Sequence, residues 1–244
     1  FTEGALAGQS FGNLILAALN GVTGSFEEAV SQMSQVLAIT GRVIPVTSAD
    51  VQLEAVFENG TRVVGGSKIY DFKKQQDCRI HHVTLIPERP RALPSALEAI
   101  READLILLGP GSLYTSVIPN LLVEGVPEAI VQSDALKLYV CNIMTQDGET
   151  EGYTAGDHLE ALMNHGAPGL VDLCLANSAP VQAGLVERYR AEDAAPLAVD
   201  RERISEGGNF ARHDPDKLAA AVLEIYRQRA VRIFRGKERY IIEE

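Results

Sequence analysis

The sequence is poor in cysteine and contains no tryptophan. Its 244 residues include three cysteines, Cys78, Cys141 and Cys174, and no CxxC pair. A disulfide-stapled secreted scaffold or a zinc ribbon needs more cysteines at closer spacing, so both classes are excluded. Cys141 and Cys174 stand inside apolar runs. We therefore expect the cysteines to be small buried side chains of a protein in a reducing compartment.

Long apolar runs are also missing. No segment approaches the roughly 18 consecutive apolar residues of a membrane-spanning helix. No charged start leads into an apolar stretch of the kind found in signal peptides. We therefore expect no membrane span and a cytoplasmic location.

Positive charge is scarce as well. The sequence has 22 Lys and Arg against 33 Asp and Glu, for a formal net charge of −11. A nucleic-acid groove or an anionic membrane surface would need clustered basic side chains, so we expect neither partner. The predicted partner is a small molecule, and backbone N–H groups in glycine-rich turns could supply the positive potential for an anionic ligand. A composition of 46% hydrophobic and 23% charged residues predicts a folded globular protein, and we expect one domain over residues 1–244.

No common catalytic or nucleotide-binding motif stands out. The sequence has no GxxxxGK[ST], GxGxxG or HExxH pattern, and no GxSxG match rises above chance. His158 and His165 are seven residues apart, which is too far along a helix for shared metal ligation, so we predict packing or solvent-facing roles and no metal site. Nothing in the sequence marks a nucleophile, and the catalytic residues, if there are any, stay unknown.

The first third of the chain predicts two helices and then antiparallel strands. Apolar residues recur at helical spacing over 10–19 and 26–39, and the first segment is so apolar that we expect it to be buried. A strand is expected at 42–47. Alternating residues at 51–57 and 61–64 flank Asn59-Gly60, which predicts a β-hairpin with a type I′ turn.

From residue 79 onward the pattern alternates between strand and helix. The strands are expected at residues 80–86, 104–108, 137–143 and 171–175. The helices are expected at residues 94–103, 115–133, 155–165, 181–189 and 214–229. Because the last three strands are apolar throughout and each precedes a helix, we predict that they are parallel neighbours. The fold class is therefore α/β: a Rossmann-like, doubly wound, mostly parallel sheet with helices on both faces and an antiparallel β-hairpin at one edge.

Ligands of such sheets bind at the carboxyl ends of the strands, so the segments that follow the strands hold the candidate residues. The turn after residue 108 has two glycines and several hydroxyl groups before a helix, which suits a phosphate cradle. A tight strand-to-helix turn explains the same residues about equally well. The candidates in this segment are Gly109, Gly111, Ser112, Tyr114, Thr115 and Ser116.

Three other polar segments supply further candidates. Asn142 and Thr145 follow the next strand, where they could hydrogen-bond a base, a ribose or a phosphate; Asp147-Gly148 in the same loop is more typical of a turn. Asn177 follows the last strand and is more typical of a helix cap. Ser10 and Asn13 stand at the start of the first helix, where Ser10 also suits an N-cap.

Three separated motifs carry a family resemblance. They are residues 8–19 (GQSFGNLILAAL), 109–122 (GPGSLYTSVIPNLL) and 139–153 (YVCNIMTQDGETEGY). In this order they resemble the YvcK group of the CofD-like family, also called the gluconeogenesis-factor group (UPF0052-type). The resemblance also implies that the chain starts downstream of the family's first strand and glycine-rich loop, and that the link between residues 204 and 205 is shorter than the family's.

The resemblance implies a regulatory protein that binds a UDP-sugar such as UDP-N-acetylglucosamine (UDP-GlcNAc) and needs no cofactor. It also implies a role in bacterial cell shape and wall-precursor supply during gluconeogenic growth. The sequence leaves open whether the protein forms a homo-oligomer and which protein partner recognises its ligand-bound state.

The alternative is a transferase like the 2-phospho-L-lactate transferase branch of the superfamily, which uses a guanylylated substrate; only this alternative would call for Mg²⁺. The loop Gly109-Pro-Gly-Ser-Leu113 differs from that branch's Gly-Pro-Ser-Asn-Pro and favours the regulator. GDP and NAD stay alternative ligands, although the missing GxGxxG weakens an NAD-dependent oxidoreductase.

Overall fold

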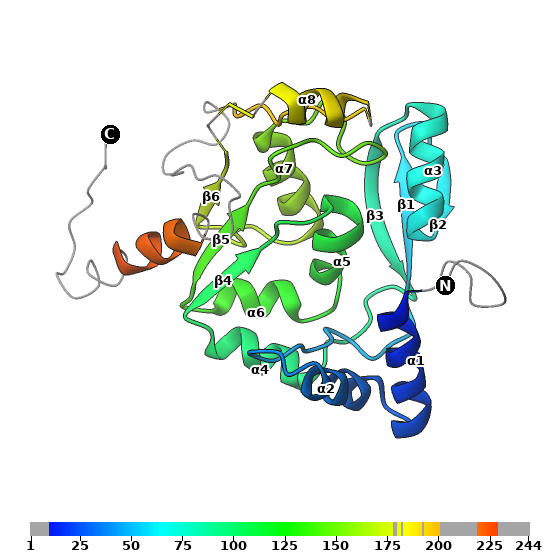
Figure 1. The fold of residues 1–244 in the computed structure, drawn as a ribbon, viewed down its shortest axis with the longest axis vertical. Coiled ribbons are helices and arrows are strands. Elements are labelled where there is room, and N and C mark those ends of the chain that lie inside the picture. Colours follow the sequence, from blue (N-terminus) through cyan, green and yellow to red (C-terminus); the bar gives the residue numbers. More distant parts are fainter. Residues whose placement is uncertain (1–9, 178–179, 182, 192, 201–218, 229–244) are drawn as a thin grey trace.

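The fold is drawn in Figure 1 from a computed structural model that describes residues 10–177, 180–181, 183–191, 193–200 and 219–228. Residues 219–228 are helical, which agrees with the expected last helix. Its expected start at Asp214-Pro215 lies outside the described residues. No helix among these residues is long and apolar enough to cross a membrane.

A parallel sheet forms the centre of the molecule. It has the order β4-β5-β6, with β4 at Leu105–Leu108, β5 at Leu136–Val140 and β6 at Leu173–Leu175. Both strand pairs are parallel, with Leu107 opposite Leu138 and Tyr139 opposite Cys174. The predicted parallel arrangement of these three strands is confirmed.

The central strand of the sheet is buried on both faces, as its apolar run predicts. All five residues of β5 are buried. On one face Leu136, Leu138 and Val140 pack against Val222 and Ile225 of the helix over residues 219–228. Tyr139 and Cys141 belong instead to the main core, with side chains from the helices α5 (Ile118–Leu121), α6 (Val126–Gln132) and α7 (Ala155–His165). The α/β fold class is thereby confirmed.

The antiparallel strands form a sheet of their own. Its order is β2-β1-β3, with β1 at Gln52–Phe57, β2 at Arg62–Val64 and β3 at Ile80–Ile86. Helix α3 (Gly66–Gln76), which the sequence analysis missed, connects β2 to β3. In Figure 1 this sheet stands beside the parallel sheet, with α5 between the two.

The hairpin between β1 and β2 is confirmed, but its predicted turn type is wrong. Phe57 N–H donates to the Thr61 carbonyl (2.9 Å), and Gly60 N–H donates to the Phe57 carbonyl (2.8 Å). Gly60 has a φ of 81°, whereas Asn59 is not among the residues with positive φ. A type I′ turn needs positive φ at both central residues, so this is a three-residue loop that ends in a left-handed glycine.

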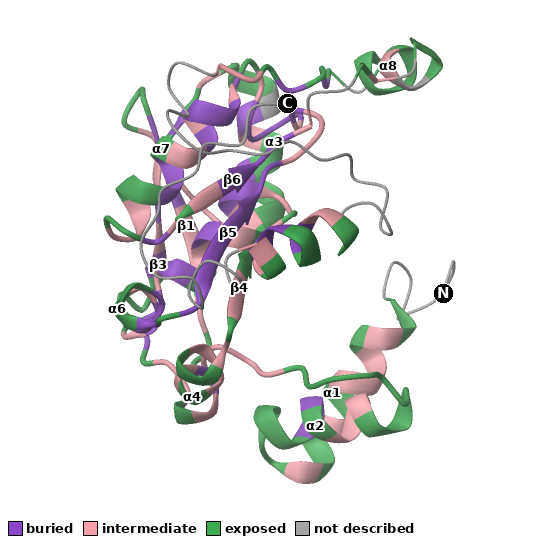
Figure 2. Cartoon of the chain, turned by 90° about the vertical axis from the view of Figure 1, so that its left-hand side faces the viewer, coloured by how far each residue is buried: buried purple, intermediate pink, exposed green. Residues whose placement is uncertain are grey.

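Three other expectations also need correction. The first helix, α1 (Phe11–Thr23), has no buried residue; it packs against α2 (Phe26–Val36) and leaves Phe11 70% exposed, because nothing else in the described part of the chain covers it. Figure 2 shows this helical pair projecting from the rest of the fold. Residues 42–47 form no strand.

The expected helix over 115–133 is divided into a π-helix η1 (Leu113–Val117), α5 and α6. Gly125, with a φ of 93°, separates α5 from α6, and each of these two helices has a proline in its first turn, where no N–H is needed. The remaining helices agree closely with expectation: α4 spans Pro94–Glu102 and α8 spans Ala183–Arg190. The expectation of a single domain over 1–244 stays a prediction.

The central strand offers a test of the packing. We expect Leu138→Ala to lower the free energy of unfolding by about 2–5 kcal/mol, because it leaves a cavity among fully buried side chains. Its matched control is Leu107→Ala on the neighbouring strand, where the side chain is 47% exposed, and that change should cost well under half as much. Urea unfolding measures both values, and equal losses would contradict the described burial.

Candidate functional site

The loops that follow β4 and β5 are joined by a reciprocal pair of hydrogen bonds. The Asn142 side-chain amide donates to the Gly111 carbonyl (2.9 Å), and Gly111 N–H donates to Asn142 Oδ1 (3.3 Å). The Asn142 side chain thus pairs with the backbone of the glycine-rich turn as a neighbouring strand would. Two predicted site residues are brought together, but much of their hydrogen-bonding capacity is already used.

A buried carboxylate holds the same two loops together further along. Glu149 is 2% exposed. Its Oε2 accepts from Tyr114 N–H (3.0 Å) and its Oε1 accepts from the Thr115 hydroxyl (2.5 Å). Burial raises the pKa of Glu149 above its usual 4.5, and the hydrogen bonds from Thr115 and Tyr114 offset only part of that effect. The donors predicted to hold a phosphate at Tyr114 and Thr115 therefore already bind an internal anion.

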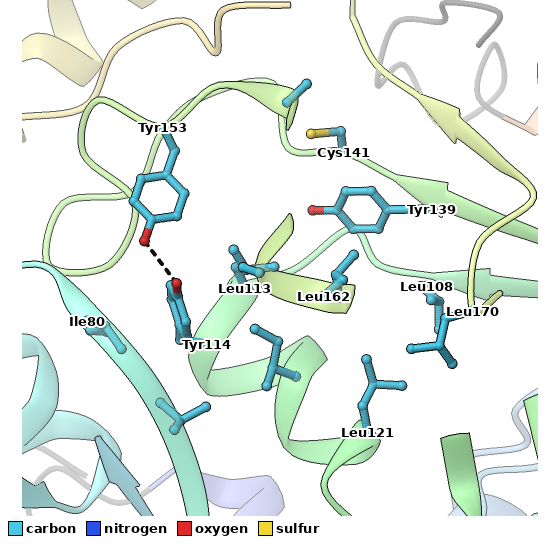
Figure 3. Packing of buried hydrophobic residues seen from close by; sticks show 14 of the residues in the cluster. Ile80, Leu108, Leu113, Tyr114, Leu121, Tyr139, Cys141, Tyr153, Leu162 and Leu170 are labelled. Atoms are coloured by element: carbon cyan, nitrogen blue, oxygen red, sulfur yellow. Dashed lines mark hydrogen bonds between the residues drawn. The ribbon is translucent and has the colours of Figure 1, made fainter. Parts of the chain in front are cut away.

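Tyr114 belongs to the hydrophobic core. It is 3% exposed, and its hydroxyl lies 2.9 Å from the hydroxyl of Tyr153, as Figure 3 shows. Its ring also meets His165 edge to face at 5.7 Å. Burial raises the Tyr114 pKa well above its usual range, so the hydroxyl stays protonated at neutral pH.

Helix α3 forms a wall beside the loop over residues 146–151. The Tyr70 hydroxyl donates to Asp147 Oδ2 (3.1 Å), and Lys73 Nζ lies 3.0 Å from Glu151 Oε2. Gly148 has a φ of 77°, and a Cβ there would lie 2.3 Å from the Tyr70 ring. The close approach of helix and loop therefore requires glycine at this position, which agrees with the predicted turn at Asp147-Gly148.

A pocket of about 570 Å³ opens where these segments meet at the carboxyl ends of β4 and β5. Four predicted residues line it: Gly111, Ser112, Asn142 and Thr145. Ser112 offers the least occupied polar group, because its hydroxyl makes no hydrogen bond to any described residue. Thr145 is 6% exposed, and its hydroxyl already accepts from Ala195 N–H (2.9 Å).

The pocket also contains residues that the sequence analysis did not select. These are chiefly Tyr70, Gln146, Asp147 and Tyr189. Gln146 and Asp147 stand inside the motif over residues 139–153, which carries part of the family resemblance and could have identified them as site residues. Tyr70 lies on α3, a helix that the sequence did not predict. Asp147 is the one charged side chain among the described lining residues.

The other predicted residues lie outside the pocket. Gly109 shapes the turn, since its φ is 75° and a Cβ there would lie 2.9 Å from the Val140 carbonyl oxygen. Ser116 is exposed, and Asn177 follows β6. Ser10 caps α1 by accepting from Asn13 N–H (3.2 Å). Helix α1 lies far from α8, which contains the pocket residue Tyr189, in Figures 1 and 2.

Neither cysteine nor histidine chemistry marks this site. Cys141 and Cys174 are buried and Cys78 is half-buried, and all three are free thiols. His158 is fully buried, which agrees with a packing role. Across the described ranges, no cluster of three or more His, Cys, Asp or Glu side chains could hold a metal ion.

The raised pKa of Glu149 generates a pH-dependent prediction. We expect Glu149→Gln to lower the free energy of unfolding by about 1–3 kcal/mol near pH 5, because an amide cannot accept from both donors as a carboxyl group does. The wild type holds more protons folded than unfolded once the pH exceeds 4.5, so its stability falls as the pH rises through the raised pKa. The deficit of the variant should therefore shrink as the pH rises above 4.5.

Urea unfolding across this pH range measures the deficit. Glu102→Gln on the exposed end of α4 serves as the control and should change the free energy of unfolding by less than about 0.5 kcal/mol. A deficit that stays constant or grows with pH would contradict the described burial of the Glu149 carboxyl.

Comparison with known proteins shows the family of the chain. The family model described as 2-phospho-L-lactate transferase CofD matches residues 1–214. The putative gluconeogenesis factor of Thermoanaerobacterium thermosulfurigenes is 45% identical over 236 residues, covering 91% of this chain and 73% of that protein. The gluconeogenesis factor of Bacillus subtilis is 41% identical over 236 residues, with coverage of 91% and 73%.

A solved structure shows the same similarity. The crystal structure of a UPF0052-family protein from Bacillus halodurans is 42% identical and superimposes with a TM-score of 0.85, covering 91% of this chain and 75% of that chain. The predicted resemblance is confirmed: the chain belongs to the CofD family and is similar, within it, to the gluconeogenesis factors.

Proposed function

We propose that this protein is a regulatory protein that binds a nucleotide sugar of the UDP-GlcNAc type and does not turn it over. The observation that carries the proposal is the pocket at the carboxyl ends of β4 and β5, lined by Gly111, Ser112 and Asn142. Ligands of open α/β sheets bind at this edge. Its volume of about 570 Å³ falls within the range of small-molecule sites.

The chemistry of the lining supports a ligand with both aromatic and polar parts. The tyrosines Tyr70 and Tyr189 offer ring surface, and the Ser112 hydroxyl and Gln146 amide offer hydrogen bonds that no described residue uses. Nucleotide sugars combine a flat base with hydroxyl-bearing rings. The family membership supports the same class of ligand, because the resemblance to the gluconeogenesis-factor group implies binding of a UDP-sugar.

Two titratable side chains, Glu149 and His165, contact Tyr114 and support binding without turnover. Both carboxylate oxygens of Glu149 are hydrogen-bonded inside the protein. His165 Nδ1 donates to the Ala161 carbonyl (2.7 Å) and its Nε2 accepts from Val83 N–H (3.0 Å), so neither nitrogen can move a substrate proton. Burial also lowers the pKa of His165, which keeps it neutral.

The cellular role follows from the family. The relatives are named gluconeogenesis factors, and we extend to this chain the role in cell shape and wall-precursor supply under gluconeogenic growth that the resemblance implies. A binding protein acts by passing its ligand state to a partner, so the role also implies a protein partner or a homo-oligomer.

A transferase is the second candidate, because the matching family model is described as 2-phospho-L-lactate transferase CofD. Phosphoryl transfer needs the charge of the phosphates to be neutralised, usually by Mg²⁺ held on carboxylates. The described pocket offers one carboxylate, Asp147, and no cluster of metal-binding side chains. This donor set does not fit a magnesium site, so we derive no reaction step through one.

The Ser112 hydroxyl tests the location of the ligand. We expect Ser112→Ala to weaken UDP-GlcNAc binding about fivefold, because one ligand hydrogen bond is worth roughly 1 kcal/mol and no internal partner is lost. The control is Ser116→Ala, four residues away on the exposed side of η1, which should bind like the wild type. Calorimetric titration measures both, and unchanged affinity in a folded Ser112→Ala protein would remove this loop from the site.

The absence of turnover is tested directly. The protein incubated with UDP-GlcNAc and Mg²⁺ should release no UDP or UMP beyond a no-protein control, because no described residue is hydrogen-bonded to the Ser112 hydroxyl as an activating base would be. Chromatography of the nucleotides measures the release. More nucleotide product than protein would contradict the proposal and favour the transferase.

A further inference from the structure

The charge of the pocket does not match a diphosphate. Among the described residues, its lining contains no lysine or arginine and one carboxylate, Asp147. This side chain is 9% exposed, so its charge is poorly screened by solvent. A phosphate placed against it would be repelled.

The turn that was expected to bind phosphate also has few donors to spare. Gly111 N–H is bound to Asn142, and Tyr114 N–H and the Thr115 hydroxyl are bound to Glu149. A second anion would have to displace the Glu149 carboxylate from two hydrogen bonds. Ser112 is the remaining donor of this turn that lines the pocket.

The groups around Asp147 suit an uncharged, hydroxyl-bearing ring. Its Oδ2 accepts from the Tyr70 hydroxyl (3.1 Å), and the two oxygens of a carboxylate can accept about four hydrogen bonds in all, which suits a ligand with several hydroxyl donors. Gln146, the preceding residue, lines the same pocket with an amide that can donate and accept. Tyr70 is 37% exposed, so part of the tyrosine remains open beside the carboxylate. A sugar ring has an apolar C–H face and hydroxyls along its edge, which matches a tyrosine beside a carboxylate and an amide.

We propose that the part of the pocket between Asp147 and Tyr70 takes the hydroxyl-bearing sugar of the ligand, with Asp147 as the residue that selects for it. This inference rests on the proposed function. The diphosphate then lies away from Asp147, toward Ser112. Tyr70 acts as a positioning residue, because its hydroxyl fixes the orientation of the carboxylate.

The test compares two probes on two variants by calorimetric titration. Asp147→Asn keeps the size of the side chain and removes its charge, so we expect it to weaken UDP-GlcNAc binding roughly ten- to a hundredfold and to leave UDP binding unchanged. Glu187→Gln on the exposed face of α8 removes the same charge outside the pocket lining and should change neither affinity. A circular-dichroism melt checks that each variant is folded.

The outcomes separate the two proposals. Tighter UDP binding in Asp147→Asn would show that the carboxylate faces the phosphates, and equal UDP-GlcNAc binding in that variant and the wild type would remove Asp147 from the site; either result overturns this inference alone. A wild-type protein that binds neither probe would overturn the proposed function as well. If Asp147→Asn does not fold, Tyr70→Phe replaces it: weaker UDP-GlcNAc binding with unchanged UDP binding supports the inference, and any other pattern contradicts it.

Discussion

The buried carboxylate of Glu149 is the contact on which the shape of the pocket depends. It receives one hydrogen bond from the backbone of Tyr114 and one from the Thr115 hydroxyl, and so ties the loop after β5 to the start of η1. Burying a charge is costly unless it is hydrogen-bonded, and a partner lost from such a site leaves the remaining groups unsatisfied. The Asn142 and Gly111 pair fixes the same two loops at the ends of their strands. The pocket is therefore rigid on this side because internal contacts, and not a ligand, satisfy its backbone.

This arrangement changes how the glycine-rich turn acts. A turn with two glycines before a helix is a common phosphate site, because unpaired N–H groups point at the ligand. Here the helix start already holds an anion that belongs to the protein. Gly109 is required by its left-handed φ and its approach to the Val140 carbonyl oxygen, whereas a Cβ on Gly111 would make only ordinary contacts at 3.6 Å or more. The turn thus places Ser112 and Asn142 at the edge of the pocket instead of enclosing a phosphate.

The sequence predicted what depends on local patterns. The apolar runs over 104–108, 137–143 and 171–175 identified the parallel strands, although β5 ends earlier, at Val140. The polar residues after the first two runs identified four lining residues. Contacts between distant segments could not be predicted from one sequence: nothing local indicates that Glu149 meets Tyr114, or that Tyr70 meets Asp147. Helix α3 was missed because its apolar residues are few. The apolarity of α1 could not show whether another segment covers it.

The account depends on a ligand that occupies the pocket without disturbing the internal anion. A crystal structure of the protein with UDP-GlcNAc tests this most directly. We expect the ligand between Tyr70 and Ser112, its sugar hydroxyls within hydrogen-bond distance of Asp147, and Glu149 still bound to Thr115 and to the backbone of Tyr114. A diphosphate seated on Tyr114 and Thr115 in place of the Glu149 carboxylate, or a ligand bound elsewhere, would contradict the account.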